Sequence, residues 1–315
     1  MSTAEQYCPE SRVGSGELQR LLAAIQNDAI GDHEVCPSPE DAEIILFVDS
    51  ARPDMRDIRG SSVFRRFRDK SFVLHCGDRV MPFVPGLFTS AERATHSPRR
   101  SRTGGYLRMA FSHHFHHTPV NGAHRFLFSF VGRSETAPVR RALVQLQHRR
   151  GLVLDTSAPG TSLAIDAYAR VIQESAFVLC PRGFGSSSFR LFEAMKTGRA
   201  PVILADDWIP PVGPEWDRFA IIVPESDVTS LPQLLEAREA ESVNMGELAR
   251  DAWETWFGKS VVFQSTVDWI LDLQRDRLLP ESVDGVLFQV GRLTPASLYR
   301  HWTQRDWRRK FGAMP

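Results

Sequence analysis

The sequence is poor in lysine and cysteine, and neither sign of charge is in excess. Among its 315 residues, 38 Lys and Arg balance 38 Asp and Glu, so the formal net charge is zero. Nucleic-acid-binding domains normally carry a clear basic excess, so we expect no nucleic-acid partner. Hydrophobic residues make up 42% of the chain, which excludes collagen-like and disordered proteins. The composition is that of a globular protein.

The few cysteines are far apart in the sequence. They are Cys8, Cys36, Cys76 and Cys180. Because no CxxC pair occurs, we expect neither a disulfide framework nor a cysteine zinc site.

Long apolar runs are missing as well. No stretch approaches the roughly 18–20 residues that a membrane-spanning helix needs. The first residues also lack the basic and apolar regions of a signal peptide. We therefore expect a soluble, cytoplasmic protein.

Arginine supplies nearly all of the positive charge. Only Lys70, Lys196, Lys259 and Lys310 are lysines, which leaves 34 arginines. Genomic base composition accounts for most of this excess. Because the planar guanidinium binds anions in a bidentate way, arginines at strand ends and helix starts are candidates for anion binding.

Short apolar runs alternate with helical patterns along most of the chain. The expected strands are 44–48, 71–76, 126–131, 152–154, 177–180, 201–204 and 220–223. The expected helices are 17–28, 138–150, 162–174, 187–197, 229–240, 243–257, 260–276 and 294–311. This alternation predicts two α/β units with parallel sheets, whose ligands bind at the carboxyl ends of the strands between the units. Only residues 77–122 have no clear pattern.

The segment Phe177–Met195, FVLCPRGFGSSSFRLFEAM, is the richest in chemical groups. It predicts a strand, a glycine turn and a helix whose N-cap is one of three serines. A helix N-terminus binds anions through free N–H groups, and Arg182 leaves the strand at the same edge. Glu193 either pairs with Arg190 on the helix or accepts hydrogen bonds from ribose hydroxyls. The segment therefore predicts an anion or nucleotide site.

This segment, followed by GRAPVILADDWIPP, resembles the exostosin family of glycosyltransferases. The similarity is strong over about 126–240, where it includes Phe130–Arg133. It is loose in the N-terminal half, at His75–Asp78 and Pro85–Phe88. Many family members are anchored in a membrane, and we expect no such anchor here. This difference points to a soluble, bacterial-type member or to a trimmed part of a longer protein.

The resemblance implies the fold class α/β, of the GT-B type, with two Rossmann-like domains that face across a cleft. Residues 1–122 would form the N-terminal, acceptor-side domain, and 123–275 the domain that binds the nucleotide-sugar. Residues 276–315 would form a helical segment that packs back on the first domain.

The resemblance also implies inverting transfer of a hexosyl or glycuronosyl group from a UDP-linked donor to a hydroxyl of a glycan or small molecule. No tightly bound cofactor and no metal would be needed, and the sequence has no DxD motif. Arg133 and Arg182 would meet the diphosphate, Arg182 would also act in catalysis, and Glu193 would bind the ribose. The donor-binding residues implied are Gly132, Arg133, Arg182, Gly183, Ser187, Ser188, Arg190 and Glu193.

Inversion requires a base that takes the proton of the acceptor hydroxyl. Asp78 follows a predicted strand and is the first candidate, although a turn aspartate after Gly77 explains it equally well. Asp49 is the second candidate. His75 fits a half-buried structural histidine.

Three other features allow more than one interpretation. Histidines of the segment 113–117 have helical metal-ligand spacing, but no acid or cysteine is close by in the sequence. A loop that lines the acceptor cleft, with one histidine touching substrate, explains them better than a metal site, and a plain interdomain loop explains them better still. Trp208 either stacks on a sugar or packs in the core. The basic, Trp-containing stretch 300–310 predicts a final helix that crosses back, with a membrane-surface patch as the alternative.

Two other functions remain open. One is a non-catalytic protein that binds a nucleotide-sugar or glycan and assists a partner transferase. The other is a GT-B epimerase, which would release free sugar without an acceptor. The sequence leaves the oligomeric state undetermined.

Overall fold

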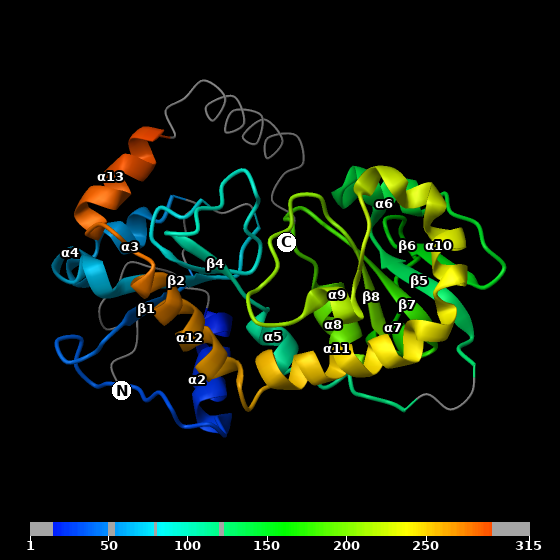
Figure 1. Cartoon of the computed structure of the whole chain (residues 1–315), viewed down its shortest axis with the longest axis horizontal. Coiled ribbons are helices and arrows are strands. Elements are labelled where there is room, and N and C mark those ends of the chain that lie inside the picture. The colour runs from blue at the N-terminus through cyan, green and yellow to red at the C-terminus, as the bar shows by residue number, and fades with distance from the viewer. Residues whose placement is uncertain (1–14, 50–53, 79–80, 120–122, 292–315) are drawn as a thin grey trace.

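The structure is a computed structural model that describes residues 15–49, 54–78, 81–119 and 123–291. The described residues form two α/β units that lie side by side along the long axis of the molecule (Figure 1). Each unit is built on one parallel sheet, so the predicted fold class is confirmed: α/β with two Rossmann-like domains.

The first unit holds a four-stranded sheet in the order β1-β2-β3-β4. The strands are β1 (Ile45–Val48), β2 (Ser71–His75), β3 (Gly86–Phe88) and β4 (Ser101–Thr103). Its helices are α2 (Ser15–Asn27), α3 (Arg56–Gly60), α4 (Ser62–Arg66), η1 (Arg68–Lys70) and α5 (Leu107–Ala110). β1 and β2 were predicted, whereas β3 and β4 have three residues each and give no periodic signal. A Cβ at Gly86 would lie 1.9 Å from the carbonyl oxygen of Val73, so only glycine allows β3 to pair so closely with β2.

The second unit holds a five-stranded sheet in the order β6-β5-β7-β8-β9. The strands are β5 (Phe126–Gly132), β6 (Gly151–Asp155), β7 (Ser175–Pro181), β8 (Ala200–Leu204) and β9 (Ile221–Ile222). All five were predicted. The strand order reverses between β5 and β7, and such a reversal opens a crevice at the carboxyl ends of the two strands.

The helices of the second unit follow the predicted pattern, except that one helix is shorter than predicted. They are η2 (Ser134–Thr136), α6 (Pro138–Leu143), α7 (Ile165–Gln173), α8 (Phe189–Thr197), α9 (Trp216–Phe219), η3 (Glu225–Ser230), α10 (Leu231–Ala237), η4 (Glu239–Glu241) and α11 (Ser242–Trp256). The helix predicted to reach residue 150 ends at Leu143. The chain then turns, so that the ring of His148 packs 5.6 Å from that of Phe128 on β5.

A single hydrophobic core runs between the two sheets. It joins Phe72 and Leu87 of the first sheet to Val178 and Ile203 of the second through helices α2, α5, α8, α11 and α12. Two separate clusters cover the outer faces of the sheets. Because apolar residues fill the junction, the two units are held in a fixed relation.

The chain returns to the first unit earlier than expected. α12 (Val262–Arg275) packs against α2, β3 and β4, although the expected boundary at residue 275 assigned it to the second unit. Buried Trp269 and Ile270 bring it there by joining the shared core. α13 (Glu281–Gly291) follows and contacts η1. The helix expected at 294–311 lies outside the described residues.

None of the helices within the described ranges is both long and apolar enough to cross a lipid bilayer.

Candidate functional site

A cavity of about 500 Å³ opens at the carboxyl ends of β5 and β7, between the two units. The second unit supplies most of its wall, and Asp78 and Tyr106 come from the first unit. The residues predicted for the site that line it are Asp78, Gly132, Arg133, Gly183, Ser187, Ser188, Arg190 and Glu193. Of the predicted residues, only Arg182 is not part of this lining. The cavity therefore lies at the point where the strand order reverses, which is where a ligand site is expected.

The turn between β7 and α8 is held by the first unit. Ser186 Oγ donates a hydrogen bond to the carbonyl of Ala91 (2.7 Å), and the N–H of Ser187 donates to Ser90 Oγ (3.1 Å). A Cβ at Gly185 would lie 2.1 Å from Ser90 Oγ and 2.4 Å from Asp78 Oδ1. Only glycine therefore allows the turn to approach the carboxylate of Asp78.

The start of α8 forms one wall of the cavity. Ser188 is the N-cap, and its side chain accepts from the N–H of Arg190. The helix ends at Gly198, whose φ of 70° is the left-handed conformation that glycine adopts most easily. Both ends agree with the sequence prediction, and the N-terminal end directs its polar groups towards the cavity.

Arg190 is buried at the floor of the cavity. One guanidinium nitrogen donates to the carbonyl of Val131, and the guanidinium carbon lies 4.7 Å from the ring centre of Phe130. Its Nε has no hydrogen-bond partner among the described residues. A Cβ at Gly132 would lie 2.7 Å from this guanidinium, so the glycine makes room for the arginine. The guanidinium thus places a buried positive charge beside the cavity.

Glu193 lies one helical turn after Arg190 and is buried as well. Its carboxylate accepts a hydrogen bond from the hydroxyl of Tyr168 (2.5 Å). Burial raises the pKa of Glu193, while the charge of Arg190 and the hydrogen bond from Tyr168 oppose that rise. The carboxylate is therefore held by Tyr168 and stabilised by the nearby charge of Arg190.

Arg140 completes the group of cations, and sequence reasoning missed it. Its Nε donates to the carbonyl of Arg182 (2.7 Å), and another nitrogen donates to the carbonyl of Pro181 (3.2 Å). Burial and the nearby charge of Arg190 lower the pKa of Arg140 to about 9. The sequence does contain a feature that could have identified Arg140 as a site residue. It lies in the first helix after β5, and that helix begins at the same edge of the sheet as the glycine turn.

Arg133 lies at the cavity as expected, whereas Arg182 does not. Arg133 lines the cavity and also forms an ion pair with Glu135. Arg182 Nε instead pairs with Glu225 Oε1 at 2.6 Å, and Glu225 in turn binds the loop after β8 through Asp206. The guanidinium of Arg182 is thus held beside the end of β9, and only its carbonyl reaches Arg140.

Of the candidate bases, Asp78 is the one that lines the cavity. Asp49 has a φ of 62° and lies with Oδ1 3.5 Å from His75 Nδ1. His75 is buried, accepts a hydrogen bond from the N–H of Gly77 (2.9 Å), and has its pKa lowered by burial. Asp49 and His75 therefore have structural contacts beneath the loop that carries Asp78.

The histidine segment 113–117 joins the two units. His114 Nδ1 lies 3.0 Å from a carboxylate oxygen of Asp166, an acid that is distant in sequence. Within the described ranges, no group of three His, Cys, Asp or Glu side chains could hold a metal ion. Trp208 is buried and packs edge-to-face on Trp216, with 5.0 Å between the rings, so the core-packing interpretation is correct.

Comparison with known proteins places this cavity in a recognised domain. Residues 94–238 match the Exostosin GT47 domain. The match begins inside the stretch 77–122, where the sequence pattern was weakest, and it includes every cavity residue named above except Asp78.

Individual relatives match over shorter lengths. An exostosin-1 homolog of Caenorhabditis elegans is 35% identical over 92 residues, which cover 28% of this chain and 24% of that protein. Human exostosin-2 is 35% identical over 95 residues, which cover 29% of this chain and 13% of that protein. A protein of Oryza sativa subsp. japonica named as a probable glucuronosyltransferase is 41% identical over 70 residues, which cover 22% of this chain and 16% of that protein. The matches thus span less than a quarter of these relatives.

A solved structure also overlaps the chain. The crystal structure of Acinetobacter baumannii MurG covers 72% of this chain and 66% of its own, with 14% sequence identity and a TM-score of 0.32. The domain match and the relatives agree with the sequence motif, and residues 94–238 therefore form an Exostosin GT47 domain.

Proposed function

We propose that this protein is an inverting glycosyltransferase that moves a sugar from a UDP-linked donor to a hydroxyl acceptor. The observation that carries the proposal is the cation group around one cavity: Arg133, Arg140 and Arg190 surround the start of α8 inside the exostosin domain. Cations and helix N–H groups that converge on one site stabilise the charge that develops on a leaving diphosphate.

The proposed donor would lie with its diphosphate against these arginines and its ribose at Glu193. Arg182 supports this arrangement through its carbonyl, which fixes the guanidinium of Arg140 at 2.7 Å. Asp78 would take the proton of the acceptor hydroxyl. The acceptor oxygen would then attack the anomeric carbon from the face opposite UDP, and the bond between that carbon and the diphosphate oxygen would break.

Calorimetry with UDP tests the donor site, and two arginine variants make the test specific. We expect UDP to bind, and Arg140→Gln to weaken binding by about tenfold or more, because a hydrogen bond to a charged group contributes roughly 1.5–3 kcal/mol. The matched control is Arg182→Gln, whose guanidinium pairs with Glu225 and should affect binding much less. Absence of UDP binding, or equal losses in both variants, would contradict the proposed site.

Donor hydrolysis separates the enzyme from a non-catalytic binding protein. We expect slow release of UDP from a UDP-sugar, unchanged by EDTA because no metal is required in the proposal. Asp78→Asn should retain UDP binding but lose transfer to an acceptor. A protein that binds UDP but neither hydrolyses nor transfers would favour the non-catalytic alternative.

A further inference from the structure

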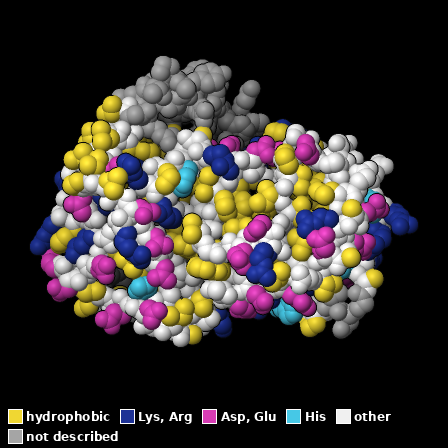
Figure 2. All heavy atoms as spheres, in the orientation of Figure 1, with side chains coloured by type: hydrophobic (Ala, Val, Ile, Leu, Met, Phe, Trp, Pro, Cys, Tyr) yellow, Lys and Arg dark blue, Asp and Glu magenta, His cyan; other side chains and the backbone are white. Residues whose placement is uncertain are grey.

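The charge on the outer surface does not explain which ligand the cavity selects. On the face of the molecule shown in Figure 2, acidic and basic side chains are interspersed over both units. Selectivity is therefore expected from a few polar groups inside the cavity. Among the described residues that line it, two are acids, Asp78 of the first unit and Glu193 of the second. Glu193 needs an explanation, because it lies on the same helix as a cation that is proposed to bind phosphate.

Arg190 does not set the direction of the Glu193 carboxylate. The two side chains are three residues apart on α8, but the guanidinium donates to the carbonyl of Val131 and packs on the ring of Phe130. Arg190 acts on Glu193 through its charge, which opposes the rise in pKa that burial causes. The group that orients the carboxylate therefore comes from another element.

That group is Tyr168 on α7. Its hydroxyl donates a hydrogen bond of 2.5 Å to Glu193 Oε2. Burial raises the pKa of Tyr168 well above its usual value, so the hydroxyl keeps the proton that it donates. The ring packs edge-to-face on the buried ring of Phe115, with 5.8 Å between the ring centres. The phenol therefore approaches Glu193 from a fixed direction.

The hydrogen bond divides the two carboxylate oxygens between the protein and the cavity. Oε2 is bound to Tyr168, and no side chain or backbone group among the described residues donates to Oε1. Because Glu193 lines the cavity, Oε1 is the oxygen that a ligand can meet. An ionised carboxylate accepts hydrogen bonds but cannot donate them, and it repels phosphate. It therefore suits a hydroxyl group of the ligand rather than the diphosphate.

We propose that Tyr168 is a positioning residue that directs Glu193 towards the ribose hydroxyls of the donor, so that the pair selects nucleotides with an intact ribose diol. The inference rests on the proposed function, because it requires the ribose to lie at Glu193. The phenol holds Oε2, and Oε1 accepts from the diol. A site built to bond a hydroxyl group rejects an analogue that lacks it, since the polar group of the site then stays unpaired.

Calorimetry with UDP and 2′,3′-dideoxy-UDP tests the proposal, because the two nucleotides differ only in the ribose hydroxyls. We expect the wild type to bind UDP at least about tenfold more tightly, as a hydrogen bond to a charged group allows. Tyr168→Phe removes the hydroxyl and keeps the ring on Phe115. It should abolish most of this preference by weakening UDP, while the affinity for the dideoxy analogue stays nearly unchanged.

Two further variants show whether Tyr168 acts through Glu193. Glu193→Gln should lower the preference as well, and adding Tyr168→Phe to it should have little further effect, because both changes remove one interaction. The matched control is Tyr106→Phe. Tyr106 is the other tyrosine of the lining and packs on Phe189, with 4.1 Å between the ring centres, so this variant should keep the full preference.

The outcomes distinguish this inference from the proposed function. If UDP binds but Tyr168→Phe keeps the preference, or weakens both nucleotides equally, the positioning role of Tyr168 is overturned and the donor site is not. If the wild type binds UDP and the dideoxy analogue equally well, the ribose does not lie at Glu193 and the inference is overturned. Absence of UDP binding by the wild type would overturn both the inference and the proposed function.

Discussion

At the scale of single residues, the site depends on glycines that let charged side chains approach the backbone. A Cβ at Gly132 would meet Arg190, and one at Gly185 would meet Asp78 and Ser90. The two glycines stand at the carboxyl ends of β5 and β7, where the cavity lies. Their role is spatial, because neither has a positive φ.

Gly185→Ala should therefore impair the site rather than the fold. The added methyl group would displace Asp78 and break the hydrogen bond from Ser187 to Ser90, so we expect UDP affinity and transfer to fall by at least about tenfold. Gly60→Ala is the control, because a Cβ there meets nothing within 4 Å. If calorimetry gives equal UDP affinity for both variants, the close approach of the chain at Gly185 to Asp78 and Ser90 does not contribute to UDP binding.

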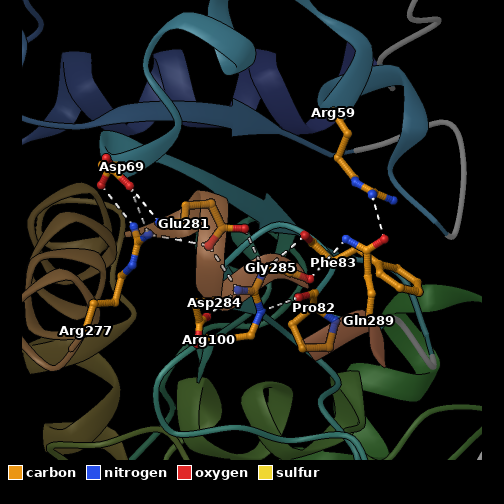
Figure 3. A network of polar contacts seen from close by, with 10 residues as sticks. All are labelled: Arg59, Asp69, Pro82, Phe83, Arg100, Arg277, Glu281, Asp284, Gly285 and Gln289. Carbon is orange, nitrogen blue, oxygen red and sulfur yellow. Dashed lines mark hydrogen bonds and ion pairs between the residues drawn. The ribbon is translucent and has the colours of Figure 1, made fainter. Parts of the chain in front are cut away.

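At the scale of elements, α13 is attached to the first unit by a buried ionic network. Arg100 is 1% exposed; it bonds both carboxylate oxygens of Glu281 at 2.8 and 2.9 Å and the carbonyls of Pro82 and Phe83. Burial raises the pKa of Glu281, and Arg100 opposes that rise. Removal of Arg100 would break the pairs with both Glu281 and Asp284 and would leave Glu281 with Arg277, 3.4 Å away, so the buried network would lose its central charge (Figure 3).

Arg100→Gln should accordingly be strongly destabilising. Loss of one partner of a buried ion pair costs about 3–5 kcal/mol, which urea unfolding would measure. Arg102→Gln removes an ion pair with Asp276, a residue whose side chain is 61% exposed, and should cost at most about 1 kcal/mol. Equal losses would mean that the network does not hold α13.

At the scale of the whole molecule, one buried histidine (His75) and two half-buried ones (His96 and His124) link stability to pH. Burial lowers the pKa of His75, His96 and His124 below the usual 6.5. Below pH 6.5 the unfolded chain takes up protons that these folded histidines resist. The stability that they contribute is thus fully present above pH 6.5 and is lost as the pH falls below it.

His75→Asn isolates one of these contributions. The Asn oxygen can accept the hydrogen bond from Gly77, and it does not titrate. Between pH 7.5 and 5.5 we expect the melting temperature to fall less in the variant than in the wild type, because all other titrating groups are shared. Parallel melting curves against pH would show that His75 does not resist protonation.

The sequence by itself determined the strands of the second unit, the first two strands, and the glycine turn with its capped helix. Each of these is specified by neighbouring residues: apolar runs set strands, and a serine and a glycine set the ends of α8. Tertiary structure alone decided that Arg182 pairs with Glu225, that Arg140 enters the site, and that α12 joins the first unit. Those outcomes depend on which residues distant in the sequence lie within reach. A long, flexible arginine side chain can form an ion pair or hydrogen bonds with any of several such residues. Local patterns specify backbone conformation, whereas packing between distant segments selects the partners of the charged side chains.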